Sequence, residues 1–484
     1  RGRIMRTLPL NIGPIHFVGI GGIGMSGIAE IMHGLGYKVQ GSDVSENPNI
    51  MRLKKLGIKI KIGHSKKNIN NVGVVVVSSA INFDNPELIA SRENFIPVVK
   101  RAEMLAELMR FKWSIAVGGT HGKTTTTSMV ASVLESAQFD PTVINGGIIN
   151  AYNTNARKGS SDWMVVEADE SDGSFVKLPA TVAIVTNIDP EHLDFYKNFD
   201  NERKAFKNFV ENIPFYGFAC MCIDHPEVQV LCSQVSDRRI ITYGLSSNAD
   251  LRAENIKIGP GGSEFDLILN EPIFKSRRIN NVGISMPGKH NVQNALAAFL
   301  VGLELGIDDR LIINSLKNFS GVKRRFTITG IIDDIKIIDD YAHHPVEIKS
   351  VLSAARSVTS GKVIAVMQPH RFSRLRDLFD EFCVSFNDAD IVIISDIYEA
   401  GENPILGINK QTLLEGIGDH GHRNVLPLDN HKDLPSMINN LAKSNDTVIC
   451  MGAGSITKWA NDLPMQINDL RKNNSKFGVY FEQK

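Results

Sequence analysis

The chain has 484 residues, 43% hydrophobic and 22% charged, and this length predicts two to four domains of ordinary globular composition. Lys and Arg together number 53, as do Asp and Glu, so no net charge draws the protein to nucleic acid or to an anionic membrane surface. No apolar run is long enough to span a bilayer, and the five scattered cysteines favour free thiols in a reducing cytoplasm.

The first predicted unit is a strand, a glycine turn, a helix and a second strand. Residues 15–18 form the apolar strand, glycines 19, 21 and 24 form the turn, and the second strand covers residues 37–40. Asp43 follows at the distance where a ribose-binding acid stands in dinucleotide-binding folds. The pattern predicts a pyrophosphate at the helix N-terminus but not which nucleotide carries it. A tight turn without a ligand is the alternative.

The next signals lead to a domain boundary. An apolar strand over residues 73–77 ends in Ser78 and Ser79, and hydroxyls at that end of a parallel strand face the ligand crevice. A helix is predicted over residues 105–109, so the first domain ends near residue 104.

The strongest motif follows a short apolar strand at residues 115–117. Gly118, Gly119 and Gly122 allow the backbone to fold around phosphate oxygens, and a helix opens with Lys123 and Thr124. In such a loop the lysine reaches the β- and γ-phosphates and the threonine hydroxyl binds Mg²⁺. The two outer glycines have three residues between them, whereas the general Walker pattern has four. A structural glycine turn is the weaker alternative.

Two later strands end in candidate site residues. Residues 163–166 lead into Glu167, the position where a second Mg²⁺ contact is expected downstream of a phosphate loop. Residues 182–185 lead into a segment that places His192 among carboxylates, which suits a metal site or proton transfer as well as a solvated turn.

Residues 213–285 are predicted to form short strands and turns with little chemistry. We expect them to make an antiparallel edge of the central domain. Asn291 and Asn294 then stand at the start of a predicted helix over residues 295–305. Their amides can bind the edge of a base or simply cap the helix.

A basic segment at residues 321–326 precedes a third α/β unit with strands at residues 335–338, 363–367, 391–394 and 448–450. Polar residues gather after these strands, at residues 339–345, 368–374, 396–402 and 452–455. Because the carboxyl ends of parallel strands meet at one edge, these segments are predicted to lie together.

Several motifs together resemble the Mur ligase family. The phosphate loop has the family's three-residue spacing, and the first glycine turn reads Gly-Ile-Gly-Gly-Ile-Gly-Met-Ser-Gly. The resemblance runs nearly end to end, through Glu-Ala-Asp-Glu-Ser-Asp, Pro-Gly-Lys-His-Asn, Asp-Asp-Tyr-Ala-His-His-Pro and Gln-Pro-His-Arg-Phe.

The resemblance implies an α/β protein of three domains. These are a Rossmann-like N-terminal domain that binds a UDP-sugar (1–104), a central P-loop ATPase domain (105–322) and a Rossmann-like C-terminal domain (323–484) that closes over ATP and brings the amino acid. The implied reaction is ATP-dependent joining of L-alanine to UDP-N-acetylmuramate through an acyl phosphate, the first peptide step of peptidoglycan synthesis. A monomer or weak homodimer with small-molecule substrates is expected.

The resemblance also assigns residues to roles. Two Mg²⁺ ions are expected, held by Thr124, Glu167 and His192. The catalytic set is expected to be Lys123, Glu167, His192, His343, Arg371 and Arg374, of which the last three resemble the amino-acid end of the site. ATP is expected to contact Gly118, Gly119, Thr120, His121, Gly122, Lys123, Thr124, Thr125, Asn291, Asn294, Arg325 and Asp340. The UDP-sugar is expected to contact Gly21, Gly22, Ile23, Gly24, Ser42, Asp43, Ser78 and Ser79.

One departure and three alternatives accompany these expectations. Some family members use a carbamylated lysine, but the register here places Phe206 at that position, so no lysine is assigned that modification. The alternatives are a muropeptide-recycling ligase that adds a tripeptide to the same nucleotide sugar, an NAD-dependent dehydrogenase, and a P-loop switch or motor. The dehydrogenase leaves Lys123 and Glu167 without a role, and the motor leaves the flanking domains unexplained.

Overall fold

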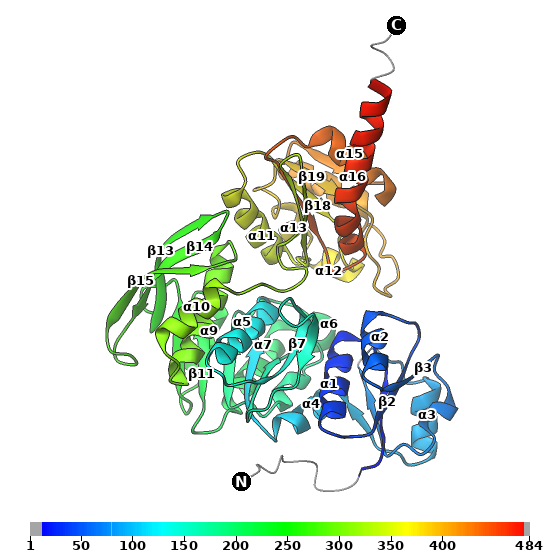
Figure 1. Ribbon diagram of the computed structural model, residues 1–484, viewed down its shortest axis with the longest axis vertical. Helices are drawn as coiled ribbons and strands as arrows, with labels where there is room; N and C mark the ends of the chain where they lie inside the picture. Colours follow the sequence, from blue (N-terminus) through cyan, green and yellow to red (C-terminus); the bar gives the residue numbers. More distant parts are fainter. Residues whose placement is uncertain (1–11, 79, 479–484) are drawn as a thin grey trace. The chain divides into compact units, whose positions relative to one another are not determined.

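The computed structural model describes residues 12–78 and 80–478, with the backbone alone for residues 193, 194 and 473–478. Within these residues the chain forms three α/β regions, each built on its own sheet, which confirms the predicted class (Figure 1). The chain divides into two compact units: residues up to 254 with 266–282 and 293–320, and residues 255–265, 283–292 and 321–484. No helix of the described part of the chain is long and apolar enough to cross a membrane.

The N-terminal region is a parallel sheet in the order β3-β2-β1-β4-β5 (blue in Figure 1). Its elements are β1 (Ile15–Val18), α1 (Ile23–Gly34), β2 (Val39–Asp43), α2 (Pro48–Lys55), β3 (Lys59–Ile62), β4 (Val74–Val77), α3 (Pro86–Glu93), β5 (Val98–Lys100) and α4 (Arg101–Met109). Because β1 lies between β2 and β4, the strand order reverses beside it, which is where α/β sheets bind ligands. The glycine turn follows the carboxyl end of β1, and Ser78 follows the carboxyl end of the neighbouring strand β4.

The second sheet has the order β15-β14-β13-β12-β11-β10-β6-β9-β7-β8. Its elements are β6 (Trp113–Gly118), α5 (Lys123–Ser136), β7 (Thr142–Ile149), β8 (Thr154–Arg157), β9 (Trp163–Glu167), β10 (Val182–Val185), α6 (Leu193–Tyr196), α7 (Phe199–Glu211), β11 (Phe218–Cys222), α8 (Pro226–Gln234), β12 (Ile240–Gly244), β13 (Leu251–Gly259), β14 (Gly262–Leu269), β15 (Arg277–Ile284), α9 (Lys289–Glu304) and α10 (Asp309–Lys317). Strand β6 pairs in parallel with both β9 and β10, so three neighbouring strands deliver the phosphate loop, Glu167 and the segment after Val185 to one edge.

Buried side chains fix the central helices. On α7, Phe206 and Phe209 are fully buried, and each ring lies 5.1 Å from the ring of Phe175. The Asn198 side chain caps α7 by accepting a hydrogen bond from the backbone of Asn201. Phe206 is therefore a core residue.

The third region has the sheet order β16-β17-β21-β18-β19-β20, in which only β16 is antiparallel to its neighbour among the described pairs. Its elements are β16 (Thr327–Ile332), β17 (Ile335–Asp340), α11 (Pro345–Val358), β18 (Val363–Met367), α12 (Phe372–Asp377), α13 (Phe379–Cys383), β19 (Ile391–Ile394), α14 (Lys410–Asp419), β20 (Val425–Pro427), α15 (Leu434–Leu441), β21 (Thr447–Met451) and α16 (Ile456–Gly478). The inner strands are buried on both faces, as their Val- and Ile-rich sequences require.

The structure corrects the prediction for residues 213–285. Strands β11 and β12 are parallel continuations of the sheet, joined by helix α8, so this stretch is not simply an antiparallel edge. Pro226 at the first turn of α8 and the buried Val228 and Leu231 explain the helix. The second strand of the chain covers residues 39–43 and not 37–40, because Gln40 to Asp43 pair with β3.

Candidate functional site

The phosphate loop requires glycine at specific positions. Gly122 has a φ of +83° in the left-handed region, and a Cβ there would lie 2.7 Å from Asn294 Oδ1. At Gly119, φ is +130° and a Cβ would lie 2.0 Å from Thr186 Oγ1. These backbone conformations and close approaches exclude other residues.

The segment after β10 binds the backbone of this loop. Thr186 Oγ1 donates to the carbonyl of His121 at 2.6 Å. Asn187 accepts from the His121 N–H at 2.7 Å and donates to the His121 carbonyl at 3.1 Å, and its own carbonyl accepts from the Thr120 N–H at 3.1 Å. We call residues 186–189 the loop clamp.

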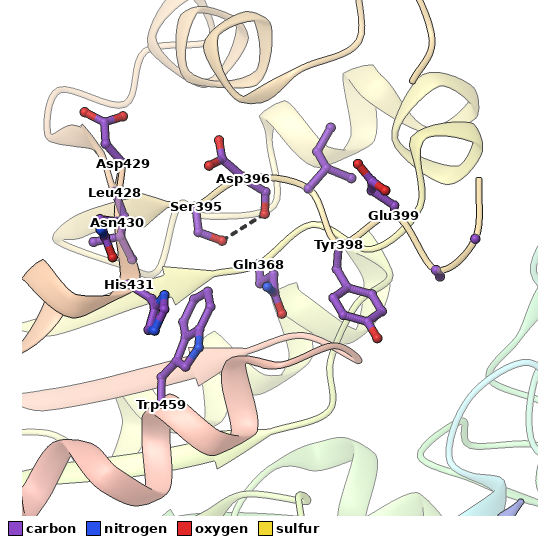
Figure 2. Close-up of a pocket in the computed structure, with 13 residues that line it drawn as sticks. Gln368, Ser395, Asp396, Tyr398, Glu399, Leu428, Asp429, Asn430, His431 and Trp459 are labelled. Carbon is purple, nitrogen blue, oxygen red and sulfur yellow. Dashed lines mark hydrogen bonds between the residues drawn. The ribbon is translucent and has the colours of Figure 1, made fainter. Parts of the chain in front are cut away.

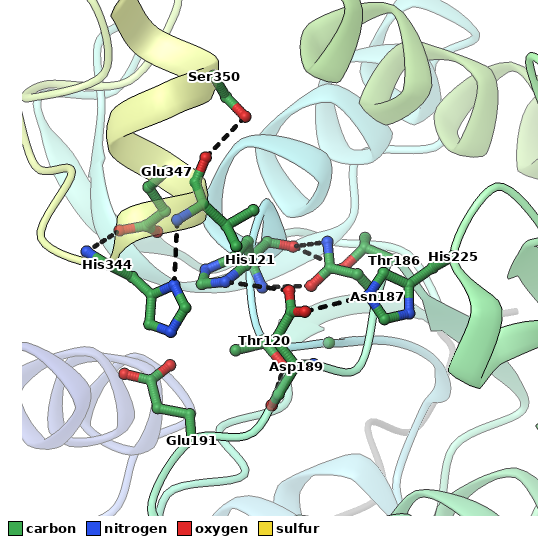
Figure 3. A network of polar contacts seen from close by, with 12 residues as sticks. Thr120, His121, Thr186, Asn187, Asp189, Glu191, His225, His344, Glu347 and Ser350 are labelled. Carbon is green, nitrogen blue, oxygen red and sulfur yellow. Dashed lines mark hydrogen bonds and ion pairs between the residues drawn. The ribbon is translucent and has the colours of Figure 1, made fainter. Parts of the chain in front are cut away.

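Asp189 completes the loop clamp (Figure 3). Its backbone N–H donates to Thr120 Oγ1 at 2.8 Å, and its carboxylate lies between His121 Nε2 at 3.3 Å and His225 Nε2 at 3.2 Å. Burial alone would raise the pKa of Asp189, but the hydrogen bonds from both histidines hold it well below its usual range. Asp189 is therefore a carboxylate throughout the physiological pH range.

Lys123 is the first residue of α5, and its side chain folds back over the loop. Its Nζ donates to the carbonyls of Gly119 (2.7 Å) and Thr120 (3.0 Å) and to Glu170 Oε1 (2.8 Å). Burial opposes charge on both partners, but the carboxylates of Glu170 and Glu167 raise the pKa of Lys123 above its ordinary value. Burial raises the pKa of Glu170, whose side chain is only 1% exposed, to about 7.

A carboxylate-rich group lies beside the lysine. Ligand atoms of Glu170, Glu191 and His192 lie within 4.8 Å of one another. Glu167 ends β9, and its carboxylate accepts from the Gly146 N–H at 2.7 Å. Glu170 Oε2 is buried without a hydrogen-bond partner among the described residues. Oxygen donors of this kind fit a hard divalent cation, and Thr124 lies next to Lys123 on α5.

Behind this group, α7 carries a second buried acid. Glu202 is 0% exposed and accepts a hydrogen bond from the Glu191 N–H at 3.3 Å. Its Oε1 has no hydrogen-bond partner among the described residues. Burial, and then the neighbouring carboxylates, raise the pKa of Glu202 to about 8. On the same helix, Lys207 lies 3.6 Å from Glu211, and Phe206 takes the core position.

In the N-terminal region, Asp43 shapes the glycine turn. Its Oδ2 accepts from the Gly21 N–H at 2.8 Å. A Cβ at Gly21 would lie 2.4 Å from Asn47 Nδ2, whereas a Cβ at Gly22 would meet nothing closer than 3.4 Å. Packing within the fold thus requires glycine at position 21, whereas a Cβ at the exposed Gly22 would make only ordinary contacts.

The other residues of this turn face the central domain or the sheet. Asn155 Nδ2 donates to the Ile23 carbonyl at 2.5 Å, and a Cβ at Gly24 would lie 3.2 Å from Arg101. Ser42 is fully buried and donates to Glu87 Oε2 at 2.6 Å, so its hydroxyl is bound within the fold. Ser78 follows β4, and Ser79 lies outside the described residues.

Sequence reasoning missed the partner of Ser42. Glu87 is 0% exposed and lies within 3.3 Å of both His16 Nε2 and His64 Nδ1. Burial opposes its charge, but hydrogen bonds from His16, Ser42 and Asn68 lower the pKa of Glu87 to about 2. The five side chains come from four separate segments, since only His64 and Asn68 are close in sequence, so no local pattern predicts the group.

The two asparagines of α9 have different surroundings. Asn294 accepts from Thr126 Oγ1 at 3.1 Å and lies against Gly122, so it contacts the phosphate loop. Asn291 donates to the Pro287 carbonyl at 2.8 Å, within the other compact unit. Thr125 is buried in the first turn of α5.

In the third region, Asp340 closes β17. Its carboxylate accepts from the backbone N–H groups of Phe326 at 2.7 Å and Ala342 at 2.8 Å. Burial raises the pKa of Asp340 to about 6. Arg325 lies 3.8 Å from Glu347 and 5.2 Å from the ring centroid of Tyr341.

Aromatic and cationic side chains meet after β17 and β18. The rings of His343 and His370 lie 5.8 Å apart, and His370 stacks on Tyr398 at 5.5 Å. Arg374 Nη1 lies 3.2 Å from His370 Nδ1, and burial, with His343 and Arg374 nearby, lowers the pKa of His370 to about 3. A neutral His370 thus accepts from Arg374. Arg371 has a φ of +70°, and its Nε is buried with no hydrogen-bond partner among the described residues.

The predicted polar segments of this region do converge. Gln368 Nε2 donates to Ser455 Oγ at 3.0 Å, and the Ser373 N–H donates to Glu402 at 3.0 Å. Beside them, a cavity of about 620 Å³ opens at the ends of β18, β19 and β20 (Figure 2). His431 stacks on Trp459 at 5.4 Å on one side of this cavity, and Tyr398 lies on the other.

Comparison with known proteins covers nearly the whole chain. Residues 14–113 match the Mur ligase family catalytic domain, residues 117–302 the Mur ligase middle domain, and residues 324–454 the Mur ligase glutamate ligase domain. The UDP-N-acetylmuramate–L-alanine ligase of Rhodospirillum rubrum is 60% identical over 468 residues, which cover 96% of this chain and 97% of that relative.

Solved structures give the same result. The UDP-N-acetylmuramate–alanine ligase of Thermotoga maritima has a TM-score of 0.79 at 29% identity, covering 94% of this chain and 99% of that one. A murein peptide ligase from Psychrobacter arcticus has a TM-score of 0.68 at 24% identity, covering 94% of this chain and 98% of the other, and this likeness concerns the fold alone.

Proposed function

The chain belongs to the Mur ligase family, and from this premise we infer its reaction: it uses ATP to join L-alanine to the carboxyl group of UDP-N-acetylmuramate in peptidoglycan synthesis. The observation that carries this function is a complete phosphate loop at the end of β6, flanked by carboxylates from the neighbouring strands, in a chain that matches L-alanine ligases over nearly its full length.

The mechanism that we propose begins with a charge problem. Transfer of a phosphoryl group from ATP to a carboxylate brings two anions together, so positive charge must lie beside the transferring group. Lys123 supplies one such charge on the loop, and ATP would replace the carbonyl and Glu170 contacts that its Nζ now makes. The loop N–H groups and the start of α5 bind the other phosphate oxygens.

A divalent cation fits the remaining donors. Glu167 and Thr124 would hold one Mg²⁺ ion, and His192 with Glu167 or Glu170 a second. Such an ion supplies charge neutralisation and holds phosphate and carboxylate oxygens in one geometry. The unpartnered Oε2 of Glu170 supports a cation at this place.

The amino-acid end of the reaction is assigned to His343, Arg371 and Arg374. An amino acid must be held by its carboxylate while its neutral amine attacks the acyl phosphate, and a guanidinium group suits a carboxylate. The buried Nε of Arg371, which lacks a partner among the described residues, supports this role. Asn291, Asn294, Arg325 and Asp340 remain assigned to ATP.

The turn after β1 is assigned to the diphosphate of the nucleotide sugar. Gly22 is exposed and carries no side chain, which supports close approach of a phosphate to its backbone, with Gly21, Ile23 and Gly24 shaping the turn. Asp43 supports this turn by accepting the hydrogen bond from the Gly21 N–H. Ser42, Ser78 and Ser79 remain assigned to the nucleotide-sugar site.

Further parts of the proposal concern the whole protein. We place the domain boundaries near residues 104 and 322, the reaction in the cytoplasm, and the protein as a monomer or weak homodimer. The free thiols of all five cysteines support a reducing compartment.

The experiment that tests the function measures phosphate release from ATP in the presence of UDP-N-acetylmuramate, with and without L-alanine. Sustained release that requires both substrates is expected, with one phosphate for each amide formed. Preference for a tripeptide over L-alanine would instead indicate the recycling ligase. Release that needs no nucleotide sugar would indicate a switch or motor, and a fluorescence change with NADH would favour a dehydrogenase.

A further inference from the structure

His225 lies at the corner where β11 ends and α8 begins. Its carbonyl accepts hydrogen bonds from the N–H groups of Val228 and Gln229, both at 3.1 Å, and Pro226 follows as the first residue of α8. Its side chain makes no capping hydrogen bond to α8. The backbone thus places His225 firmly, while its ring serves something other than this helix.

The preceding residue anchors the same corner from the other side. Asp224 accepts hydrogen bonds from the Leu245 N–H at 2.7 Å and from the Ser246 N–H at 2.9 Å. Gln293, one residue before the loop-contacting Asn294, donates to Asp224 Oδ2 at 2.6 Å. The backbone position of His225 is therefore fixed by contacts on both sides of the residue.

The ring contacts the loop clamp. His225 Nε2 lies 3.2 Å from Asp189 Oδ1, while His121 Nε2 lies 3.3 Å from Asp189 Oδ2 (Figure 3). A carboxylate only accepts hydrogen bonds, so the imidazole of His225 must carry a hydrogen on Nε2. The Asp189 carboxylate thereby lies against the ring of a histidine inside the phosphate loop with one oxygen, and His225 holds its other oxygen.

We propose that His225 is a positioning residue for ATP: through Asp189 it fixes the orientation of His121 and hence the shape of the phosphate loop. The inference rests on the proposed function of this loop in binding ATP. His225 touches no substrate in this scheme. Loss of its hydrogen bond lets the Asp189 carboxylate rotate, which frees the His121 ring and loosens the loop.

Two variants of His225 test the proposal. His225→Leu removes the donor, whereas His225→Gln keeps an N–H donor four bonds from Cα, as in the imidazole. Gln229→Leu is the matched control, because it removes a hydrogen bond of 2.6 Å to the Ile223 carbonyl in the same corner without touching Asp189. For each variant, the ATP dissociation constant, kcat and the KM for every substrate are measured.

A net hydrogen bond corresponds to about a 2- to 12-fold change in an equilibrium constant. We expect His225→Leu to raise the dissociation constant and KM for ATP by roughly that factor, with the UDP-N-acetylmuramate KM unchanged. His225→Gln should restore most of the ATP affinity, and Gln229→Leu should behave like wild type. In ¹⁵N spectra of the histidine rings, the ring-nitrogen signals of His121 should differ between the wild type and His225→Leu.

Three results would overturn the proposal. The first is an unchanged ATP dissociation constant in His225→Leu. The second is an equal loss of ATP affinity in His225→Leu and His225→Gln, and the third is an equal rise in KM for ATP and for the nucleotide sugar. The direct ATP measurement separates this inference from the proposed function. A wild type that binds ATP but forms no amide would refute the proposed function. The ATP dissociation constants of the His225 variants would still test the positioning role in that case.

Discussion

Replacing Glu202 by Gln should stabilise the protein at neutral pH, and increasingly so as the pH rises. The carboxyl is fully buried on α7 with its Oε1 unpartnered among the described residues, and its pKa is raised from 4.5 to about 8. A raised carboxyl pKa means that the folded chain holds a proton that the unfolded chain has released. The contribution that protonated Glu202 makes to the free energy of unfolding is therefore fully present below pH 4.5 and is lost progressively up to about pH 8.

The magnitude follows from this pKa difference. Each pH unit between the unfolded pKa and the working pH costs about 1.4 kcal/mol until the folded pKa is reached. Between pH 5 and pH 8 the wild type should thus lose about 2–4 kcal/mol that Glu202→Gln, which keeps an acceptor for the Glu191 N–H, does not lose.

Hydrogen exchange of peptides covering α7, in buffer with a chelator, measures the opening free energy of this region alone. The difference between Glu202→Gln and wild type should grow between pH 5 and pH 8 by that amount. Glu211→Gln, which removes a half-exposed carboxylate from the same helix, should show no such growth. A difference between Glu202→Gln and wild type that stays the same at both pH values would refute the assigned pKa and its cause.

Three further predictions concern the site. Lys123→Ala combined with Glu170→Gln should abolish amide formation in a folded protein, because the second change removes the buried carboxylate that the first would leave unpaired; near-normal turnover would refute the phosphate-loop assignment. Gly22→Val should raise the KM for UDP-N-acetylmuramate with little change in the KM for ATP, because the new side chain obstructs the diphosphate while its Cβ meets no protein atom closer than 3.4 Å. A change in the KM for ATP instead would mean that the two glycine loops have the opposite roles. Arg374→Ala should raise the L-alanine KM by about 10- to 150-fold while hydroxylamine still traps the acyl phosphate; an unchanged KM would remove Arg374 from the amino-acid site.

The sequence predicted those parts of the site that obey local rules. Strand β6 and its loop could be located because a buried strand, left-handed glycines and a Lys-Thr helix start must follow one another directly. Glu167 could be located because an apolar strand downstream of the phosphate loop ends in an acid there, and the structure places that strand beside β6. The roles of these residues in catalysis stay predictions.

The sequence could not predict the contacts that depend on how distant segments are brought together. His225 meets Asp189 36 residues away, and Ser42 meets Glu87 45 residues away. Such pairs arise from sheet order and loop paths, and the stretches around His225 and Glu87 carry no motif. The same reason explains why the stretch around His225 was predicted to hold little chemistry.

The loop clamp has a consequence for the thermodynamics of ATP binding. Fixing the backbone of one residue costs about 1–2 kcal/mol of conformational entropy. Because residues 186–189 already hold Thr120 and His121 through backbone hydrogen bonds, this ordering occurs when the central sheet folds and not when the nucleotide arrives. A protein with a loosened clamp should therefore bind ATP more weakly, with a more unfavourable binding entropy at similar enthalpy.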